Sequence, residues 1–396
     1  MVRPASAPSH PASATTIVEQ LLSDAMTKRA SDVHLEPHAN GLRVRLRIDG
    51  LLHEHQVLDR TQINAITARI KILAGLDIGQ QRLPQDGRLK LNTHASVAHE
   101  FRVSSCPTLF GEKLVLRHID HLSTLPSLKQ LGMLESQYQQ LRDAIAHPWG
   151  MVLVTGPTGS GKTVTLYAAL QALNQDHRNI STIEDPIEMT LPGVNQVQCH
   201  EAIGLGFANT LRTFLRQDPD VLMIGEIRDA LTAKMAVEAA QTGHLVFSSL
   251  HTHTALATLT RLRHLGISTP DLIGALRLVL SQTLMRKLHD CKQPDDSEKA
   301  KQLMVNAASP NKAQIYQSAG CARCRSGYLG RVGVFETLPI TSSVRQSLLD
   351  AQSPESLSSS GFSDDWIDLR KAARDHVLSG ISSLAEMNRV TSELIH

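Results

Sequence analysis

The stretch Gly156-Pro-Thr-Gly-Ser-Gly-Lys-Thr163 fits the phosphate-loop pattern G-x-x-x-x-G-K-[ST] in full. The apolar run 151–155 before it predicts a short buried strand, and residues 164–170 after it predict the start of a helix. Glycines let such a loop curl so that several backbone N–H groups face phosphate oxygens, and the helix N-terminus adds partial positive charge. Strand, loop and helix in this order predict a nucleotide-binding α/β core.

All eight loop residues are predicted to bind ATP, and they are Gly156, Pro157, Thr158, Gly159, Ser160, Gly161, Lys162 and Thr163. The ammonium group of Lys162 is expected to reach the β- and γ-phosphates. The hydroxyl of Thr163 is expected to bind Mg²⁺, which makes ATP and Mg²⁺ the predicted cofactors.

Composition limits the other function classes. The chain has 396 residues, which favours two or three domains, and its 41% hydrophobic content supports a sizeable core. A net charge of +2 and an aromatic content of 3% argue against a nucleic-acid partner. No apolar run reaches the ~18 residues of a membrane span. Residues 1–15 are rich in Pro, Ala and Ser without an apolar centre, which predicts a disordered tail on a cytoplasmic protein rather than a signal peptide.

Hydrophobic periodicity divides the remainder into two domains with a linker at 121–128. Residues 16–120 predict a compact α+β domain, with helices at 17–28 and 61–74 and strands at 32–36, 41–48, 51–57, 87–91, 95–104 and 113–119. Residues 129–396 alternate helices and strands, which indicates a parallel sheet covered by helices. This second domain includes a cysteine-containing segment at about 285–335, a polar loop at 353–365 and closing helices at 366–380 and 384–394.

Acidic residues follow two predicted strands of the second domain. Glu226 ends the segment Asp220-Val-Leu-Met-Ile-Gly-Glu226, and Glu184 lies in Thr182-Ile-Glu-Asp-Pro-Ile-Glu188. Ligands of open α/β sheets bind at the carboxyl ends of the strands, where a carboxylate holds Mg²⁺ or accepts a proton from water. Glu226 is predicted to contribute to the Mg²⁺ site. Either Glu184 or Glu226 is predicted to be the general base, and a capping role in a turn is the alternative for the Glu184 segment.

These motifs resemble, in order, those of the secretion ATPase superfamily, and most of all the type II secretion and type IV pilus assembly ATPases. The phosphate loop corresponds to the Walker A motif, 181–188 to the Asp box, 211–229 to the Walker B segment and 240–252 to the His box. The N-terminal stretches 30–37, 45–50, 82–88 and 101–104 match as well. The resemblance covers residues 16–396.

The resemblance implies a homo-hexameric, Mg²⁺-dependent ATPase, with a PAS-like domain followed by a RecA-like domain. It implies a place on the cytoplasmic face of the bacterial inner membrane, where the ATPase drives pilin or pseudopilin addition through a polytopic platform protein. Glu184 and Glu226 would be the catalytic carboxylates, and His244 and His251 would sense the γ-phosphate. His244 directly precedes an apolar strand and His251 directly follows it, so the residues alone also permit ordinary strand-end histidines.

Four arginines match positions that the family places around the nucleotide. Arg102 and Arg117 belong to the N-terminal domain, and Arg212 and Arg216 belong to the core. An arginine supplied across an interface stabilises the charge that builds up during phosphoryl transfer. Surface ion pairs are the alternative for each of them.

Two departures of the sequence from the family bear on its recruitment and on metal binding. The usual members carry a further N-terminal domain, whereas only about fifteen residues precede the first domain here. We therefore expect a short-form member, like those of some competence systems, with a different mode of recruitment. The family often binds zinc with two C-x-x-C pairs. Here the second pair is present as Cys321 and Cys324, whereas the first pair is incomplete and is represented by His289 and Cys291. Four Cys or His ligands satisfy structural zinc, so the segment is either a zinc site or the remnant of one.

Three other functions remain as alternatives. A pilus retraction ATPase shares the fold, but such proteins generally lack the cysteine segment. A nucleotide-regulated scaffold with little turnover is disfavoured because Lys162, Glu184 and Glu226 are all present. A nucleic-acid translocase is disfavoured by the weak net charge and the scarcity of aromatic residues.

Overall fold

The structure is a computed structural model that describes residues 13–92, 98–119, 125–305, 314–350 and 366–391. The chain divides into two compact units, residues 1–122 and 123–396, and each is described on its own. Residues 1–12 of the predicted tail, 95–97 of the predicted strand 95–104, 121–124 of the linker and the whole polar loop 353–365 lie outside the described residues. Residues 14 and 15, predicted to belong to the tail, are helical.

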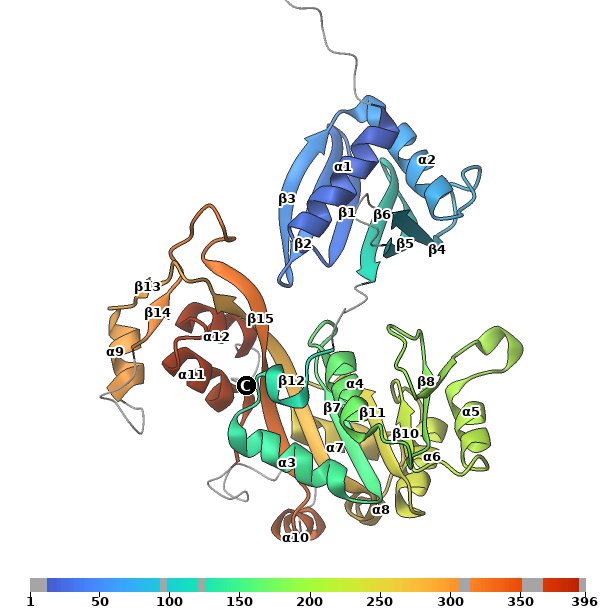
Figure 1. The fold of residues 1–396 in the computed structure, drawn as a ribbon, viewed down its shortest axis with the longest axis vertical. Helices are drawn as coiled ribbons and strands as arrows, with labels where there is room; N and C mark the ends of the chain where they lie inside the picture. The colour runs from blue at the N-terminus through green and yellow to red at the C-terminus, as the bar shows by residue number, and fades with distance from the viewer. Residues whose placement is uncertain (1–12, 93–97, 120–124, 306–313, 351–365, 392–396) are drawn as a thin grey trace, which may run out of the picture. The chain divides into compact units, whose positions relative to one another are not determined.

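The N-terminal unit is an antiparallel sheet with two helices packed against it (Figure 1). Its helices are α1 (Ala14–Thr27) and α2 (Ile63–Leu73), and its strands are β1 (Asp32–His38), β2 (Gly41–Ile48), β3 (Leu51–Leu58), β4 (Gln85–Asn92), β5 (Ala98–Thr108) and β6 (Gly111–Ile119). The strand order is β3-β2-β1-β6-β5-β4. The α+β character is as predicted, while the PAS-like assignment stays a prediction.

Alternation along the strands separates the two faces of this sheet. In β2, Leu42, Val44 and Leu46 are buried in the core that α1 and α2 cover. Arg43 and Arg45 project from the opposite face and form ion pairs with Glu36. Because side chains alternate with a period of two, one apolar and one charged face follow directly from the sequence.

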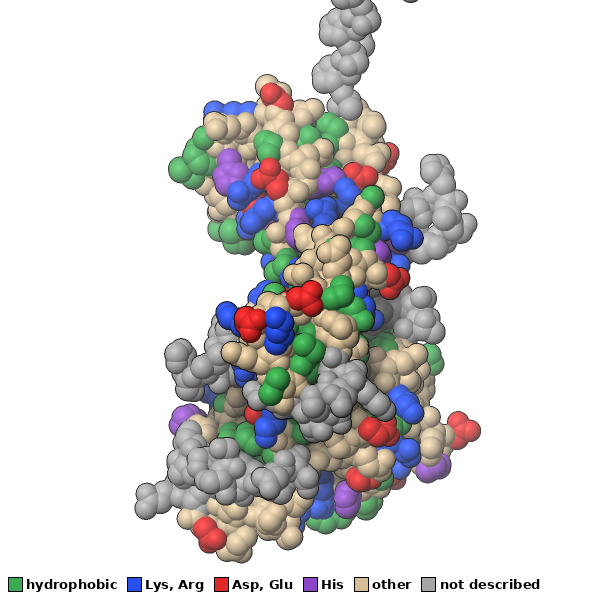
Figure 2. All heavy atoms as spheres, turned by 90° about the vertical axis from the view of Figure 1, so that its left-hand side faces the viewer, with side chains coloured by type: hydrophobic (Ala, Val, Ile, Leu, Met, Phe, Trp, Pro, Cys, Tyr) green, Lys and Arg blue, Asp and Glu red, His purple; other side chains and the backbone are tan. Residues whose placement is uncertain are grey.

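Four arginines cross the charged face in one row of neighbouring strands. The register places Arg47 beside Asp32, Asp32 beside Arg117, Arg117 beside Arg102, and Arg102 beside Arg88. The Arg117 Nε donates to Asp32 at 2.9 Å, and Arg102 is exposed. Basic, acidic and histidine side chains also lie side by side on the part of the N-terminal unit that Figure 2 turns to the viewer.

The second unit is built on a seven-stranded sheet in the order β15-β12-β7-β11-β10-β8-β9. The sheet is parallel from β12 to β9, and β15 runs antiparallel to β12. The strands of the unit are β7 (Gly150–Thr155), β8 (Ile180–Glu184), β9 (Asn195–Gln198), β10 (Val221–Ile224), β11 (Leu245–Leu250), β12 (Leu276–Leu288), β13 (Gln293–Pro294), β14 (Tyr316–Gln317) and β15 (Tyr328–Pro339). The helices are α3 (Glu135–Ala146), α4 (Lys162–Leu173), α5 (Phe207–Phe214), α6 (Ala230–Gln241), α7 (Ala255–His264), α8 (Thr269–Ala275), α9 (Glu298–Val305), α10 (Ser342–Asp350), α11 (Leu369–Leu378) and α12 (Leu384–Thr391).

Helices cover both faces of this sheet, as the predicted α/β class requires (Figure 1). In β7, Met151 and Leu153 pack into the core with α5, α6, α7, α8 and α10. Val152 and Val154 face the other way and pack with α3 and α4. Every residue of β7 is buried, so the strand before the phosphate loop is held on both sides.

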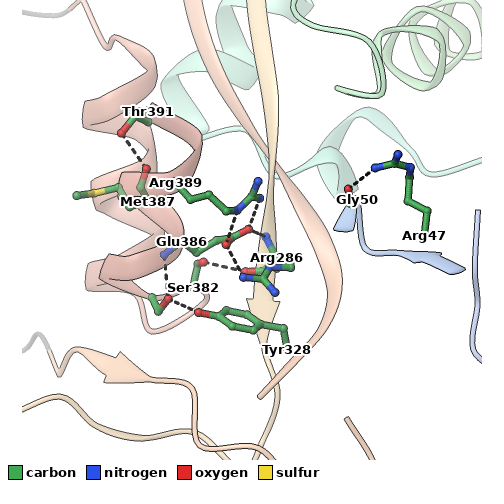
Figure 3. A network of polar contacts seen from close by, with 10 residues as sticks. Arg47, Gly50, Arg286, Tyr328, Ser382, Glu386, Met387, Arg389 and Thr391 are labelled. Carbon is green, nitrogen blue, oxygen red and sulfur yellow. Dashed lines mark hydrogen bonds and ion pairs between the residues drawn. The ribbon is translucent and has the colours of Figure 1, made fainter. Parts of the chain in front are cut away.

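The C-terminal helices are fastened to β12 by a set of contacts that we call the helical network, made of Arg286, Tyr328, Glu386 and Arg389 (Figure 3). The carboxylate of Glu386 on α12 is fully buried and accepts from Arg286 at 2.8 Å and from Arg389 at 2.5 Å. The Arg286 guanidinium stacks over the Tyr328 ring at 4.0 Å. The two arginines hold the pKa of Glu386 at about 2, against the cost of burial, which is the largest single influence and acts to raise it.

Candidate nucleotide site

The phosphate loop follows β7 directly and leads into α4. Gly156, Gly159 and Gly161 adopt φ values of 140°, 79° and 91°, which strongly favour glycine. A Cβ at Gly156 would lie 2.2 Å from the Gln282 carbonyl oxygen, so no other residue fits there. The Gln282 side chain donates to the Ser160 carbonyl at 2.6 Å, so β12 supports the loop from below.

Lys162 occupies the first turn of α4 and bends back over its own loop. Its ammonium group donates to the carbonyls of Gly156 at 2.8 Å and Pro157 at 3.2 Å. Burial lowers the pKa of Lys162, while the nearby charge of Glu226 acts in the opposite direction. The hydroxyl of Ser160 is buried and has no hydrogen-bond partner among the described residues. A polar cradle with an unpaired donor and a cation is suited to binding a phosphate.

A second group of charged side chains meets Lys162 at the carboxyl ends of β10 and β11. The Nδ1 atom of His251 lies 3.5 Å from the Lys162 Nζ, and its Nε2 lies 3.0 Å from a Glu226 oxygen. Arg228 forms an ion pair with the other Glu226 oxygen and lies 3.7 Å from Asp185. We call Lys162, Glu226, Arg228 and His251 the loop cluster.

The partners of His251 assign the position of its proton. An ammonium group only donates hydrogen bonds, so the Nδ1 atom facing Lys162 accepts. The remaining ring nitrogen, Nε2, then carries the hydrogen and donates to Glu226. A neutral imidazole thus connects the lysine of the phosphate loop with the carboxylate after β10.

Glu184 ends β8 and is bound quite differently. Its side chain is buried and accepts hydrogen bonds from three neutral groups. Thr182 Oγ1 donates at 2.6 Å and Gln196 Nε2 at 3.0 Å to one carboxylate oxygen, and the Tyr167 hydroxyl donates to the other. Strand register places Glu184 level with Gly225, one strand away. Both predicted carboxylates therefore lie at the same edge of the sheet.

The structure does not join the other predicted core residues to this cluster. His244 precedes β11, and its carbonyl accepts from the N–H of Gly150, at the end of the sheet opposite to the loop. Its Nδ1 lies 3.1 Å from the Ala239 carbonyl. Arg212 and Arg216 are exposed on α5 and directly after it, and Arg216 donates to the Arg212 carbonyl at 2.9 Å. The roles predicted for these three residues stay predictions, as do those of Arg102 and Arg117.

Sequence reasoning missed three residues of the site. Arg228 was read only as part of a matched segment, Tyr167 as a helix residue, and Gln282 lay in a region not assigned to a strand. The contacts of Gln282 with Ser160 and of Tyr167 with Glu184 join residues 122 and 17 positions apart. The alternating apolar residues of β12 were the only sequence signal for Gln282.

His289, Cys291, Cys321 and Cys324 converge in the C-terminal part of the second unit. Their ligand atoms all lie within 4.8 Å of one another. The sulfur atoms of Cys321 and Cys324 are 3.6 Å apart, and Cys291 lies 3.7 Å from Cys324. Ligands about 2.3 Å from a tetrahedral zinc ion are separated by about 3.8 Å, so the four residues fit such an ion.

Most of the chain matches a known family. The model of the type II/IV secretion system protein family matches residues 9–389. The type IV pilus assembly ATPase PilB of Acinetobacter baylyi is 43% identical over 381 residues, which are 95% of this chain and 66% of the relative. The type II secretion system ATPase E of Vibrio cholerae is 41% identical, over 95% of this chain and 75% of the relative. The chain thus spans about two thirds of the first relative's length.

Solved structures share the fold. The ATPase DotB of Legionella pneumophila has a TM-score of 0.73 at 23% identity, with 98% of each chain covered. The pilus retraction motor PilT with bound ADP has a TM-score of 0.61 at 24% identity, covering 94% of this chain and 96% of that one. Within the described part of the chain, every helix is too short or too polar to span a bilayer.

Proposed function

We propose that this chain, which belongs to the type II/IV secretion system protein family, hydrolyses ATP to power the assembly of a pilus or pseudopilus. The observation that carries the proposal is the loop cluster, in which the lysine of a phosphate loop, a histidine and a carboxylate stand in one contact chain. Relatives named for pilus assembly and type II secretion are 41–43% identical, against 24% for the retraction motor. Assembly is therefore favoured over retraction.

The residues of the site would have separate roles in binding and hydrolysing ATP. The loop N–H groups and Lys162 bind the phosphates, and Thr163 with Glu226 would hold Mg²⁺, which neutralises the charge on the phosphates when it is bound. Glu184 accepts the proton of the attacking water, because neutral donors orient this carboxylate without a cation that competes for the proton. His251 reports the state of the γ-phosphate through its contacts with Lys162 and Glu226.

The assembled machine is part of the same proposal. A homo-hexamer on the cytoplasmic face of the inner membrane would act on a polytopic platform protein. Arg102, Arg117, Arg212 and Arg216 would reach the nucleotide in the ring, where their exposed guanidinium groups stabilise transition-state charge. His289, Cys291, Cys321 and Cys324 would hold one structural Zn²⁺ per chain.

Phosphate release by the purified chain with MgATP tests the proposed activity. Lys162→Ala is expected to abolish hydrolysis and leave the fold intact, because Lys162 contacts the loop rather than the core. Lys234→Ala is the matched control, since Lys234 is exposed on α6 with only a 3.9 Å contact to Glu238. Equal activity of the two variants would contradict the proposed function.

A further inference from the structure

The Tyr167 hydroxyl lies at the centre of a buried arrangement that the proposed function does not use. Tyr167 belongs to α4, the helix that begins at Lys162, and its side chain is among the largest fully buried ones. Its oxygen accepts from the N–H of Glu188 at 3.3 Å, and its hydrogen points to Glu184. A hydroxyl has one proton, and the backbone N–H leaves only the carboxylate to receive it.

The two carboxylate oxygens of Glu184 accept different numbers of hydrogen bonds. An ionised carboxylate has about four acceptor positions, two on each oxygen. Thr182 and Gln196 both donate to Oε1, whereas Tyr167 is the one donor to Oε2 among the described residues. The open acceptor position is therefore on Oε2, the atom whose direction the phenol determines.

We propose that Tyr167 is a positioning residue for ATP hydrolysis, which aims Oε2 of Glu184 at the attacking water. This inference rests on the proposed function, because it assumes that Glu184 accepts the proton. The phenol stays a donor throughout the physiological range, since burial and then the Glu184 carboxylate raise its pKa. Tyr167 lies about 7.5 Å along α4 from Lys162, so one rigid helix sets both the phosphate-binding ammonium and the direction of the base.

The phenol is well suited to this task because it can orient the base without neutralising it. A guanidinium at the same place would hold the carboxylate more strongly and would lower its affinity for a proton. Glu226 has such a partner in Arg228, and Glu184 has none among the described ion pairs. Neutral donors therefore fix the orientation of this buried carboxylate without placing a positive charge beside it.

Tyr167→Phe tests the proposal, because it removes the hydroxyl and keeps the ring. We expect kcat for ATP hydrolysis to fall about tenfold, with the KM for ATP unchanged within about twofold. A loss confined to kcat separates a positioning role from a structural one, because a disturbed fold would also change the binding of ATP. The matched control is Tyr328→Phe, since Tyr328 is also buried and its hydroxyl lies 2.6 Å from Ser383 Oγ.

A second variant keeps the test decisive if Tyr167→Phe does not fold. Thr182→Val removes a donor to Oε1, which still has Gln196, so we expect only a two- to threefold loss of kcat. Overturning outcomes are a kcat of Tyr167→Phe that matches that of Tyr328→Phe, or a larger loss of kcat with Thr182→Val than with Tyr167→Phe. If the unmodified chain binds MgATP without turnover, the proposed function fails first and this inference falls with it.

Discussion

The loop cluster and the helical network use the same kinds of side chains in opposite ways. In the helical network, Glu386 is fully buried between two arginines, and its carboxylate oxygens face only protein atoms. In the loop cluster, Glu226 also meets an arginine, but the side chains of Arg228 and His251 are 60% and 53% exposed. The first arrangement fixes a fold, whereas the second leaves charged atoms that a ligand can reach.

This difference distinguishes charged side chains that serve function from charged side chains that stabilise the fold. Lys162 contacts backbone carbonyls of its own loop, and these contacts are replaced at little cost when phosphate oxygens enter. Arg286 instead contacts a buried carboxylate whose cationic partners, among the described residues, are Arg286 itself and Arg389. Changes in the loop cluster should therefore alter turnover, and changes in the helical network should alter stability.

The largest expected effect is on turnover, with Glu226→Gln. Glutamine keeps the size of the side chain but loses the charge that pairs with Arg228 and that accepts the hydrogen bond of His251. We expect ATP binding to persist and kcat to fall about 10²- to 10³-fold, as when one group that stabilises the transition state is removed. Nucleotide titration and phosphate release measure the two quantities, and the unfolding midpoint should stay close to that of the unmodified chain. A large loss of stability would mean that the loop cluster is structural.

Glu386→Gln is the reverse experiment. It leaves two arginines of the helical network without their anionic partner, so the free energy of unfolding should fall by about 3 kcal/mol. The control is Glu298→Gln, because Glu298 forms a similarly spaced pair with Lys301 but its side chain is 81% exposed. Exposed pairs contribute less than about 1 kcal/mol. Equal effects of the two substitutions in denaturant unfolding would contradict the distinction.

Acid should act on the same network. The arginines depress the pKa of Glu386 to about 2 in the folded chain, below the ordinary value of 4.5. A depressed carboxyl pKa contributes stability that is fully present above about pH 4.5 and is lost as the pH falls toward 2. The unmodified chain should thus lose more stability than Glu386→Gln over this window, as thermal unfolding at a series of pH values would measure. Parallel curves for the two proteins would contradict this pH dependence.

The sequence predicted those elements of the molecule that are formed by contiguous residues. The strand, the phosphate loop and the helix are contiguous, so the pattern 156–163 with its apolar flanks was enough to place them. The acidic strand ends followed from the same logic, because carboxyl ends of parallel strands share one edge. Both Glu184 and Glu226 lie at that edge.

The pairing of strands that lie far apart in the chain could not be predicted from the sequence. The segment Leu276–Leu288 forms β12, a central strand between β7 and β15, yet sequence reasoning assigned no strand there. Its burial is continuous only from Leu278 to Gln282, where the main sheet and its helices enclose it, and becomes mixed beyond Gln282. A strand that changes its surroundings midway has no single period, and its antiparallel pairing with β15 depends on residues about fifty positions away.

The two histidines show the limit of motif reasoning within one chain. Both lie in the matched His box, but β11 separates them, with His244 at its beginning and His251 after its end. Six strand residues span about 20 Å, so both rings do not reach the same phosphate loop. The contacts of His251 follow from its place after the strand, whereas His244 lies before the strand and away from the loop cluster of this chain, so its predicted role stays a prediction.

The smallest expected effect on chemistry comes from the cysteine segment, which extends the comparison to metal. If His289, Cys291, Cys321 and Cys324 hold zinc, protein purified without chelators should contain about one Zn²⁺ per chain by elemental analysis. Cys321→Ser should lower this content and the unfolding midpoint by several degrees, because metal ligation contributes folding free energy. Cys106→Ser is the control, since Cys106 is an exposed cysteine of the N-terminal unit. ATP hydrolysis should change less than twofold in both variants, because the described contacts of these histidine and cysteine side chains do not include the loop cluster. Zinc-free protein would identify the segment as a remnant, and a loss of turnover that matches Glu226→Gln would erase the distinction between structural and functional clusters.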